Sequence, residues 1–183
     1  MIPKILSKSI ILKTPWIKVI QSKFKNKDDN ESTWTWVQRV NFGAVMIVPY
    51  LKGDSTRLIL LKEWRVPLED WEISFPAGLI EKNEDIEVAA QRELLEETGF
   101  SIKKVDKKTP QIYNTSGLTD EKITLLFAEV NPNRVEMVLE ENETIEVLIL
   151  DRDQILELMQ SNVKFSAKSW LILDRFIETG KAY

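Results

Sequence analysis

The sequence predicts an α+β fold preceded by a small β-rich extension. Its 183 residues, 43% hydrophobic and 30% charged, have the composition of an ordinary globular protein. Segments with strand character are mixed with a few helical segments, without regular alternation of strand and helix. The first forty residues carry strand segments only. We therefore expect an N-terminal β subdomain over residues 1–40 and a second domain over residues 41–183.

Three segments of the N-terminal region are rich in Ile, Val, Thr and Trp, as strands are. They are residues 9–14, 16–24 and 32–40. The polar run 25–31 separates the second from the third and is typical of a turn. The sequence therefore predicts a β-hairpin here.

The second domain begins with two strands of the core. Residues 44–50 form a continuous hydrophobic run, which indicates a strand covered on both faces. Residues 57–64 form a similar strand after the turn 52–55. Further strands are expected at 123–130 and 145–150.

Three helices are expected in the same domain. Residues 85–98 give the strongest pattern, with acidic residues in the first turn and Gly99 placed to end the helix in a left-handed conformation. The other two are expected near residues 152–159 and 167–177.

The composition excludes several classes of function. The chain contains no cysteine and no histidine, so it has no thiol nucleophile, no imidazole base and no zinc site of nitrogen and sulfur ligands. Catalysis must use carboxylates, Lys, Tyr, Ser, Thr or a metal bound by oxygen. The net charge of -4 argues against a nucleic-acid partner. Without a long apolar segment or a signal-peptide pattern, we expect a cytoplasmic protein with no membrane partner.

The helix expected at 85–98 carries an unusual arrangement of acids. At about 100° per residue, Glu93, Glu96 and Glu97 fall within an arc of about 100°. Glu93 and Glu97 point along the apolar stripe that begins at Ile86, whereas solvated acids should lie opposite it. Like charges so placed either acquire raised pKa values or share a cation. Carboxylate oxygens prefer a hard ion such as Mg²⁺.

The neighbouring residues fit the same hypothesis. Arg92 follows Glu84 by eight residues and precedes Glu96 by four, so it is able to link the helix to the preceding loop. Residues 75–78 predict a tight turn whose carbonyl groups approach a metal, and Gly78 adds no Cβ to obstruct that approach. The alternative is a solvated helix with ordinary Glu–Arg pairs.

The chain combines, at fixed spacing, Gly78, Glu84, Arg92, Glu93, Leu94, Glu96, Glu97, Gly99 and Phe100. The chance occurrence of this spacing in a chain of this length is below about one in a million, which argues against a solvated helix with ordinary ion pairs. With this spacing the sequence resembles the Nudix hydrolases. The resemblance implies an α/β/α sandwich with a mixed sheet, and metal-dependent hydrolysis of a nucleoside diphosphate linked to another group. Glu84 and Arg92 become a structural pair.

The resemblance also implies the metal site. Glu93 and Glu97 correspond to the principal metal ligands and act in catalysis, and Glu96 corresponds to a further ligand. The carbonyl oxygen of Ala77 corresponds to a backbone ligand. The implied cofactor is Mg²⁺, with Mn²⁺ as the alternative ion.

Beyond this motif the chain is similar to the ADP-ribose pyrophosphatase branch of the family. The resemblance implies a homodimer that exchanges its N-terminal strands. Trp16 and Trp34 correspond to tryptophans that sandwich the adenine, one from each subunit. The alternative is that both residues serve only packing. The flat aromatic face of a tryptophan side chain is able to stack on a nucleobase.

Four more site residues follow from the same branch. Arg39 and Arg65 correspond to arginines that bind the diphosphate, for which a planar guanidinium is well suited. A catalytic carboxylate from a later loop corresponds to Glu143 first and Glu141 second, with a solvated acidic loop as the alternative.

The expected reaction is hydrolysis of ADP-ribose or a related ADP-sugar to AMP and a sugar phosphate. Two positions depart from the branch: Ser74 replaces a usual glutamate, and Ser116 replaces a usual proline. The alternatives are a GDP-mannose or UDP-sugar diphosphatase and a non-catalytic nucleotide sensor. A sensor typically lacks a carboxylate of the metal helix, and this chain retains all of them.

Overall fold

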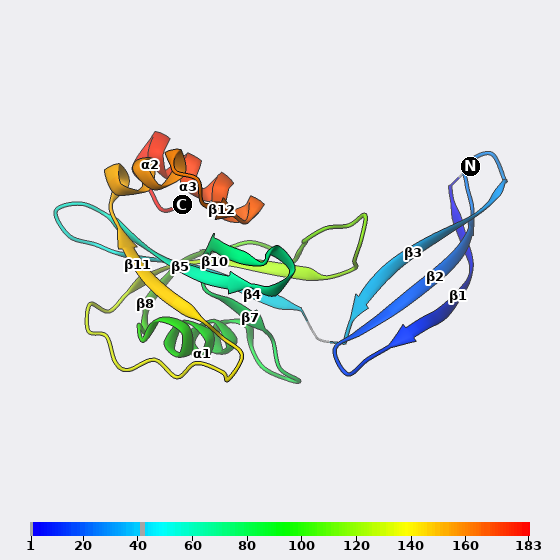
Figure 1. The fold of residues 1–183 in the computed structure, drawn as a ribbon, viewed down its shortest axis with the longest axis horizontal. Helices are drawn as coiled ribbons and strands as arrows, with labels where there is room; N and C mark the ends of the chain where they lie inside the picture. Colours follow the sequence, from blue (N-terminus) through cyan, green and yellow to red (C-terminus); the bar gives the residue numbers. More distant parts are fainter. Residues whose placement is uncertain (1, 41–42) are drawn as a thin grey trace.

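The computed structural model describes residues 2–40 and 43–183, which form two sheets and three helices (Figure 1). The first sheet is antiparallel, in the order β1 (Lys4–Lys13), β2 (Ile17–Lys25), β3 (Glu31–Arg39). The three N-terminal strands and the β2–β3 hairpin are confirmed, with β1 beginning earlier than predicted.

The second sheet is mixed and has nine strands. Its main path runs β12-β6-β5-β4-β10-β8, and β11, β7 and β9 pair with β5, β4 and β10. The β4–β10 and β6–β12 pairs are parallel and the others antiparallel. A short 3-10 helix, η1 (Val66–Leu68), links β5 to β6. The strands are β4 (Ala44–Leu51), β5 (Arg57–Arg65), β6 (Asp70–Ser74), β7 (Ala77–Leu79), β8 (Ile102–Lys108), β9 (Ile112–Tyr113), β10 (Lys122–Val130), β11 (Ile145–Leu150) and β12 (Lys164–Phe165).

Helices cover both faces of this sheet, as an α/β/α sandwich requires. In Figure 1, α1 (Ile86–Thr98) lies on one face, and α2 (Arg152–Gln160) and α3 (Ala167–Thr179) lie on the other. The α+β class and the three predicted helices are confirmed. None of the helices in the described residues combines the length and hydropathy of a transmembrane helix.

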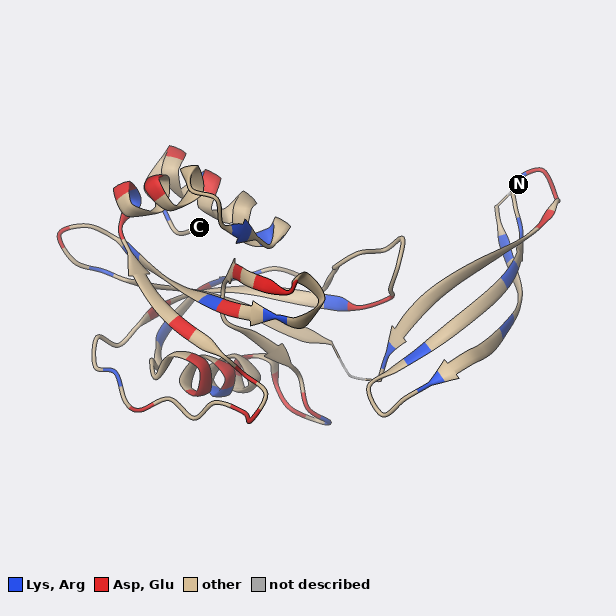
Figure 2. Cartoon of the chain, viewed as in Figure 1, with Lys and Arg blue, Asp and Glu red and all other residues tan. Residues whose placement is uncertain are grey.

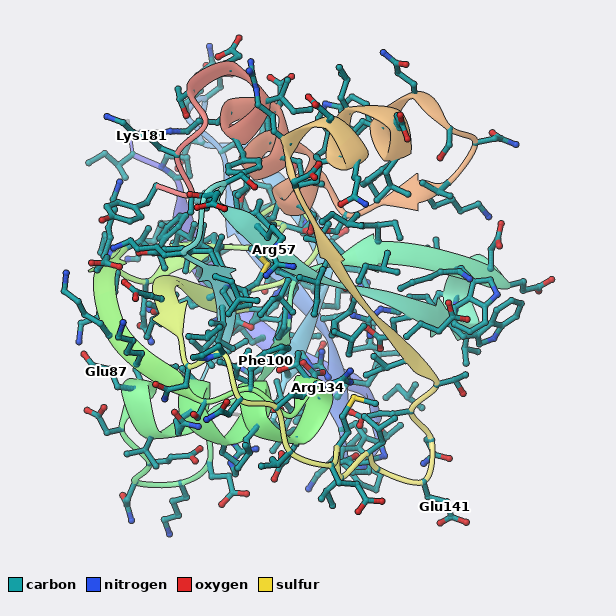
Figure 3. All side chains as sticks on the ribbon, turned by 90° about the vertical axis from the view of Figure 1, so that its left-hand side faces the viewer. Arg57, Glu87, Phe100, Arg134, Glu141 and Lys181 are labelled. Carbon is teal, nitrogen blue, oxygen red and sulfur yellow. The ribbon has the colours of Figure 1, made fainter. Side chains whose placement is uncertain are left out.

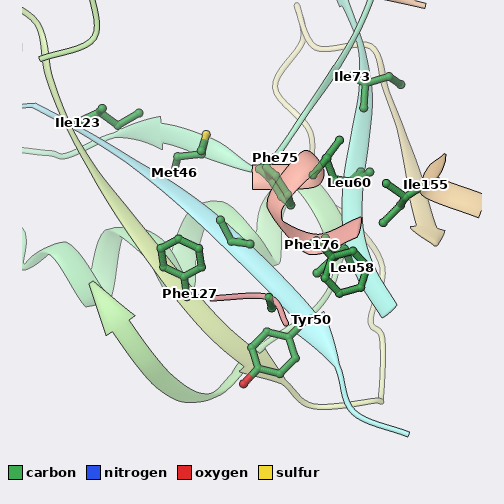
Figure 4. Packing of buried hydrophobic residues seen from close by; sticks show 13 residues of the cluster. Met46, Tyr50, Leu58, Leu60, Ile73, Phe75, Ile123, Phe127, Ile155 and Phe176 are labelled. Carbon is green, nitrogen blue, oxygen red and sulfur yellow. The ribbon is translucent and has the colours of Figure 1, made fainter. Parts of the chain in front are cut away.

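The apolar residues of the strands divide into two cores, one under each helical layer. The core under α2 and α3 contains Tyr50, Phe75 and Phe176 (Figure 4). The core under α1 contains Ile59 and Leu94. Because β4 and β5 supply both cores, their continuous hydrophobic runs are explained.

Helix α1 ends at Thr98, as predicted, and begins at Ile86, one residue later than predicted. The side chain of Asp85 caps the first turn by accepting a hydrogen bond from Glu87 N. Gly99 ends the helix at a φ of 73°, and a Cβ there would lie 2.1 Å from the carbonyl oxygen of Val135. Glycine is therefore required for both backbone conformation and space.

The sequence prediction was wrong about the segment before α1. Residues 77–78 were predicted within a tight turn, but they begin β7, which pairs with β4. Strands β6 and β8 were not predicted. Strand β6 is only five residues long, and β8 is rich in charged residues because it ends the main path of the sheet, where side chains remain partly solvated.

The N-terminal sheet contacts the rest of the chain along β3. Val37 N donates a 2.8 Å hydrogen bond to Leu118 O, and Gln38 Nε2 donates to Asp120 at 3.2 Å. The domain boundary placed between residues 40 and 41 stays a prediction, since residues 41–42 lie outside the described part of the chain.

Candidate active site

A cleft of about 680 Å³ lies where the N-terminal sheet meets the second sheet and α1. Its wall brings together side chains from both sheets, α1, α3 and the loop before β11. Seven of the predicted site residues line it: Trp16, Arg39, Arg65, Ala77, Arg92, Glu93 and Glu143.

Two acids of α1 turn toward the sheet. Glu97 is 5% exposed, and its Oε2 accepts a hydrogen bond from Ala77 N at 3.0 Å. Glu93 lies against β7, where a Cβ on Gly78 would stand 1.8 Å from the carboxyl carbon of Glu93. The missing side chain at Gly78 therefore makes room for this carboxylate. Glu96 faces outward with 42% of its side chain exposed.

Burial changes the protonation of these acids. The pKa of Glu97 is raised well above the ordinary glutamate value by burial first, and by the negative charge of Glu93 next. Burial also raises the pKa of Glu93, although Arg92 opposes this effect. The pKa of Glu63 on β5 is raised mainly by burial as well. A bound cation would stabilise the charged form of all three carboxylates and lower their pKa values.

The loop between β10 and β11 brings Glu143 to this group. Val135 N and Val138 N donate hydrogen bonds to Gly99 O and Glu96 O, which fixes the loop along the end of α1. Glu143 then lies close enough to raise the pKa values of Glu63, Glu93 and Glu97 by charge repulsion.

The second predicted loop acid lies apart from the cleft. Glu141 is exposed and is not part of the cleft wall. Figure 3 shows its side chain at the periphery of the loop. Of the two loop acids, the geometry therefore favours Glu143 as the one that acts in the cleft.

Arg92 holds the loop before α1 against the helix. Its Nε and Nη2 donate to the two carboxylate oxygens of Glu84, both at 3.0 Å, and Nη2 also donates to Leu79 O. Nη1 donates to Glu93 at 2.8 Å and to Glu96 at 3.3 Å. The pKa of Glu84 is lowered by this pairing. The arginine thus fixes the direction of Glu93.

The donor set suits a hard divalent ion that also binds substrate. Across residues 2–40 and 43–183, no three carboxylates converge as a complete metal site. Mg²⁺, however, uses one or two protein carboxylates and completes its shell with waters and phosphate oxygens. Glu93 and Glu97 supply that number, and the absence of a side chain at Gly78 makes room for the Glu93 carboxylate. Figure 2 shows the concentration of acidic positions along α1.

Both predicted phosphate-binding arginines line the cleft, and both are ion-paired. Arg39 Nη1 lies 3.2 Å from Glu121 Oε1. Arg65 pairs with Glu63 and lies 3.3 Å from Glu72 Oε2 through its Nε. The carboxylates orient the two guanidinium groups on the cleft wall.

The two predicted base-stacking tryptophans lie apart within one chain. Trp16 lines the cleft and is 72% exposed. Trp34 is 54% exposed, donates to Gly117 O at 3.1 Å, and borders a separate hollow of about 470 Å³. On β2, the residue paired with Trp34 is Ser22, which lies six positions after Trp16. The two tryptophans are therefore separated by about 20 Å along the strand.

Sequence reasoning missed Glu63 and Lys168. The alternation of β5 could have indicated Glu63, because Ile59 faces α1 and every second residue shares that face. The position of Lys168 had no such signal, because it depends on where α3 begins relative to the cleft.

The raised pKa values predict an unusual pH dependence of stability. A raised carboxyl pKa means that the folded protein binds more protons than the unfolded chain at pH values above about 4.5. Stability must then fall as pH rises. We expect the metal-free protein to unfold at a lower temperature at about pH 8 than at about pH 5.5, and no histidine contributes in that window.

Thermal unfolding of two variants checks this assignment. Glu97→Gln should reduce the pH dependence, whereas Glu87→Gln, at an exposed position of the same helix, should leave it unchanged. A pH dependence that is identical in all three proteins would contradict the buried charge of Glu97.

Comparison with known proteins gives the following similarities. Residues 40–171 match the sequence profile of the NUDIX domain. The chain is 33% identical over 170 residues to the ADP-ribose pyrophosphatase of Saccharomyces cerevisiae, covering 84% of this chain and 73% of that protein. It is 35% identical over 128 residues to the ADP-ribose pyrophosphatase of Bacillus subtilis, covering 69% and 68%.

A more distant relative and a solved structure agree with these matches. The mouse ADP-sugar pyrophosphatase is 27% identical over 164 residues, covering 83% of this chain and 75% of that protein. The crystal structure of an ADP compounds hydrolase has a TM-score of 0.78 at 23% identity and covers 96% and 92% of the two chains. At that identity, the structural match supports the fold.

Proposed function

The chain belongs to the Nudix hydrolase family, and on that premise we propose that it hydrolyses the diphosphate of ADP-ribose or a related ADP-sugar. The products are AMP and a sugar phosphate. The observation that carries this proposal is the cleft itself, whose wall holds Glu93 of α1 together with Arg39 and Arg65. Buried Glu97 lies one turn from Glu93 on the same helix. Relatives named ADP-ribose pyrophosphatase and ADP-sugar pyrophosphatase support the choice of substrate.

Glu93 and Glu97 are the residues that would hold the metal, for which we propose Mg²⁺, with Mn²⁺ as the alternative. When bound, the ion supplies charge neutralisation for the diphosphate and a more acidic water. Glu97 is held by Ala77 N and Glu93 by Arg92, so neither carboxylate needs to reorganise. Glu96 and the carbonyl oxygen of Ala77 remain proposed further ligands.

Glu143 is the proposed base or water-orienting group. In hydrolysis, a water oxygen bonds to one phosphorus atom, the bond from that phosphorus to the bridging oxygen breaks, and the bridging oxygen leaves with the other phosphate. A carboxylate near the water accepts the released proton. Glu143 Oε2 accepts a hydrogen bond from Glu140 N at 2.9 Å, which helps to hold the carboxylate near Glu93 and Glu97.

Arg39 and Arg65 are proposed to bind the diphosphate. A guanidinium offers a fork of donors that matches phosphate oxygens. In this structure Glu121 forms an ion pair with Arg39, and Glu72 forms one with Arg65. These carboxylates keep the arginines directed into the cleft until the diphosphate arrives.

We further propose a homodimer that exchanges its N-terminal sheets. Within one chain, Trp16 and Trp34 are too far apart to sandwich one base, but the tryptophans of two chains could do so. Every residue of β1 is exposed. A partner that covers this strand would bury its large apolar side chains, which are Ile5, Leu6, Ile10, Ile11 and Leu12.

Removal of either tryptophan is expected to weaken base binding. Stacking is worth about 1–3 kcal/mol for each base, so Trp16→Ala and Trp34→Ala should each raise KM about 5- to 150-fold. If stacking is equal in ground and transition states, kcat hardly changes. Steady-state kinetics on ADP-ribose and GDP-mannose measure this. An unchanged KM in variants that remain folded dimers would assign both residues to packing.

A panel of nucleotide sugars tests the substrate. With Mg²⁺, we expect the highest kcat/KM for ADP-ribose or another ADP-sugar, scored by release of nucleoside monophosphate. A preference for GDP-mannose or a UDP-sugar would replace the substrate and keep the reaction class. Tight nucleotide binding without release of any monophosphate would indicate the non-catalytic sensor.

A further inference from the structure

Lys168 differs from the other cations of the cleft. Arg39, Arg65 and Arg92 all line the wall, and each pairs with at least one carboxylate. Lys168 also lines the wall, but among the described residues it makes no ion pair. Its Nζ donates a 2.6 Å hydrogen bond to the neutral amide oxygen of Asn114.

The surroundings of Lys168 leave its charge poorly compensated. Burial lowers the pKa of Lys168, and the positive charge of Arg65 adds to this effect. The carboxylates of Glu121 and Glu72 act in the opposite direction, but their oxygens already bind Arg39 and Arg65. A half-buried ammonium group in this position gains from an added anion.

The start of α3 provides further donors at the same place. Ser166 caps this thirteen-residue helix and lines the cleft together with Lys168, which stands in the first turn. The first turn of a helix has unpaired N–H groups and a partial positive charge.

A buried hydroxyl group without a partner lies beside this turn. Ser74 lines the cleft and is 5% exposed, and its Oγ has no hydrogen-bond partner within residues 2–40 and 43–183. Its strand is joined to the helix start by a 3.3 Å hydrogen bond from Ser166 N to Ile73 O. The hydroxyl is therefore a second donor near Lys168 that awaits an acceptor.

We propose that Lys168 binds the diphosphate of the substrate, with the first turn of α3 and Ser74 supplying neighbouring donors. This assignment rests on the proposed function and adds to it a cation from the C-terminal helix. Arg65 approaches the diphosphate from β5, and Lys168 approaches it from α3. The two cations lie close enough to repel each other, so an anion between them stabilises both.

Ligand binding to Lys168→Met tests the proposal. The two ligands are adenosine and the non-hydrolysable methylene-bridged analogue of ADP, each titrated by calorimetry with Mg²⁺. Loss of a charge-assisted hydrogen bond should weaken binding of the ADP analogue about 10- to 100-fold. Adenosine has no phosphate, so its affinity should change less than about twofold, and Lys168→Arg should restore most of the affinity for the analogue.

Lys164→Met is the matched control, because Lys164 lies four residues earlier, outside the cleft wall, and pairs with Asp70. It should bind both ligands as the wild type does. The assignment would be overturned if Lys168→Met lowered the affinity for both ligands equally, or if it left the affinity for the ADP analogue unchanged.

The binding experiment also separates the two proposals. If the panel selects a guanosine or uridine substrate, the corresponding nucleoside and diphosphate analogue replace the adenine pair. Absence of ADP-ribose hydrolysis would thus refute the proposed substrate while the role of Lys168 is still decided by these titrations.

Discussion

Glu97→Gln is expected to lower kcat at least about a hundredfold and to leave the protein folded. Glu97 is buried beside Glu93 and accepts a hydrogen bond from Ala77 N. The amide oxygen of glutamine is able to accept the same hydrogen bond. The substitution, however, removes the negative charge that binds a divalent ion. Because burial disfavours the charged form of Glu97, the variant should be at least as stable as the wild type near neutral pH.

Turnover and thermal unfolding measured on the same preparation check both parts of this result. Glu87→Gln serves as the control, since Glu87 lies exposed on α1 and pairs with Lys108. Wild-type turnover in Glu97→Gln, with the metal still required, would contradict the role of Glu97. Activity retained after chelation would contradict the metal mechanism.

Removal of residues 1–31 is expected to abolish activity and dissociate the proposed dimer. The deletion removes β1 and β2, and with them Trp16. Strand β3 would remain attached through Val37 but would lose its partner in the sheet. Sedimentation velocity and turnover on ADP-ribose measure the two effects.

A second variant keeps the whole cleft wall while changing the surface of β1. Ile10→Lys combined with Leu12→Lys replaces two exposed apolar side chains on this strand. We expect it to dissociate as the truncation does, with a raised KM. A wild-type protein that is already monomeric would contradict the proposed dimer. Full activity of a monomeric truncated or substituted protein would show that base binding needs neither the dimer nor the exchanged sheet.

Much of α1 was predictable because local rules determine it. The apolar stripe from Ile86, the cap at Asp85 and the glycine at position 99 agree with one another, and each is satisfied in the structure. The direction of Glu97 followed from the same periodicity, since a residue on the apolar face of a helix must enter the core.

The remaining parts of the site depend on contacts between distant segments. Lys168 enters the cleft only because β12 pairs with β6 and sets the start of α3, and a two-residue strand has too short a pattern to predict. Glu143 is placed by a loop bonded to the end of α1. Strand β8 has the sequence IKKVDKK, whose many charged residues hide its strand character. These residues are tolerated because β8 lies at the edge of the sheet.

The most direct test of the proposed function is the product analysis of ADP-ribose incubated with the full chain and Mg²⁺. We predict AMP and ribose 5-phosphate in equal amounts, with formation of both abolished by a chelator and restored by excess Mg²⁺. Absence of AMP, or AMP formation that continues in the chelator, would contradict the proposal that this cleft is a metal-dependent ADP-sugar diphosphatase site.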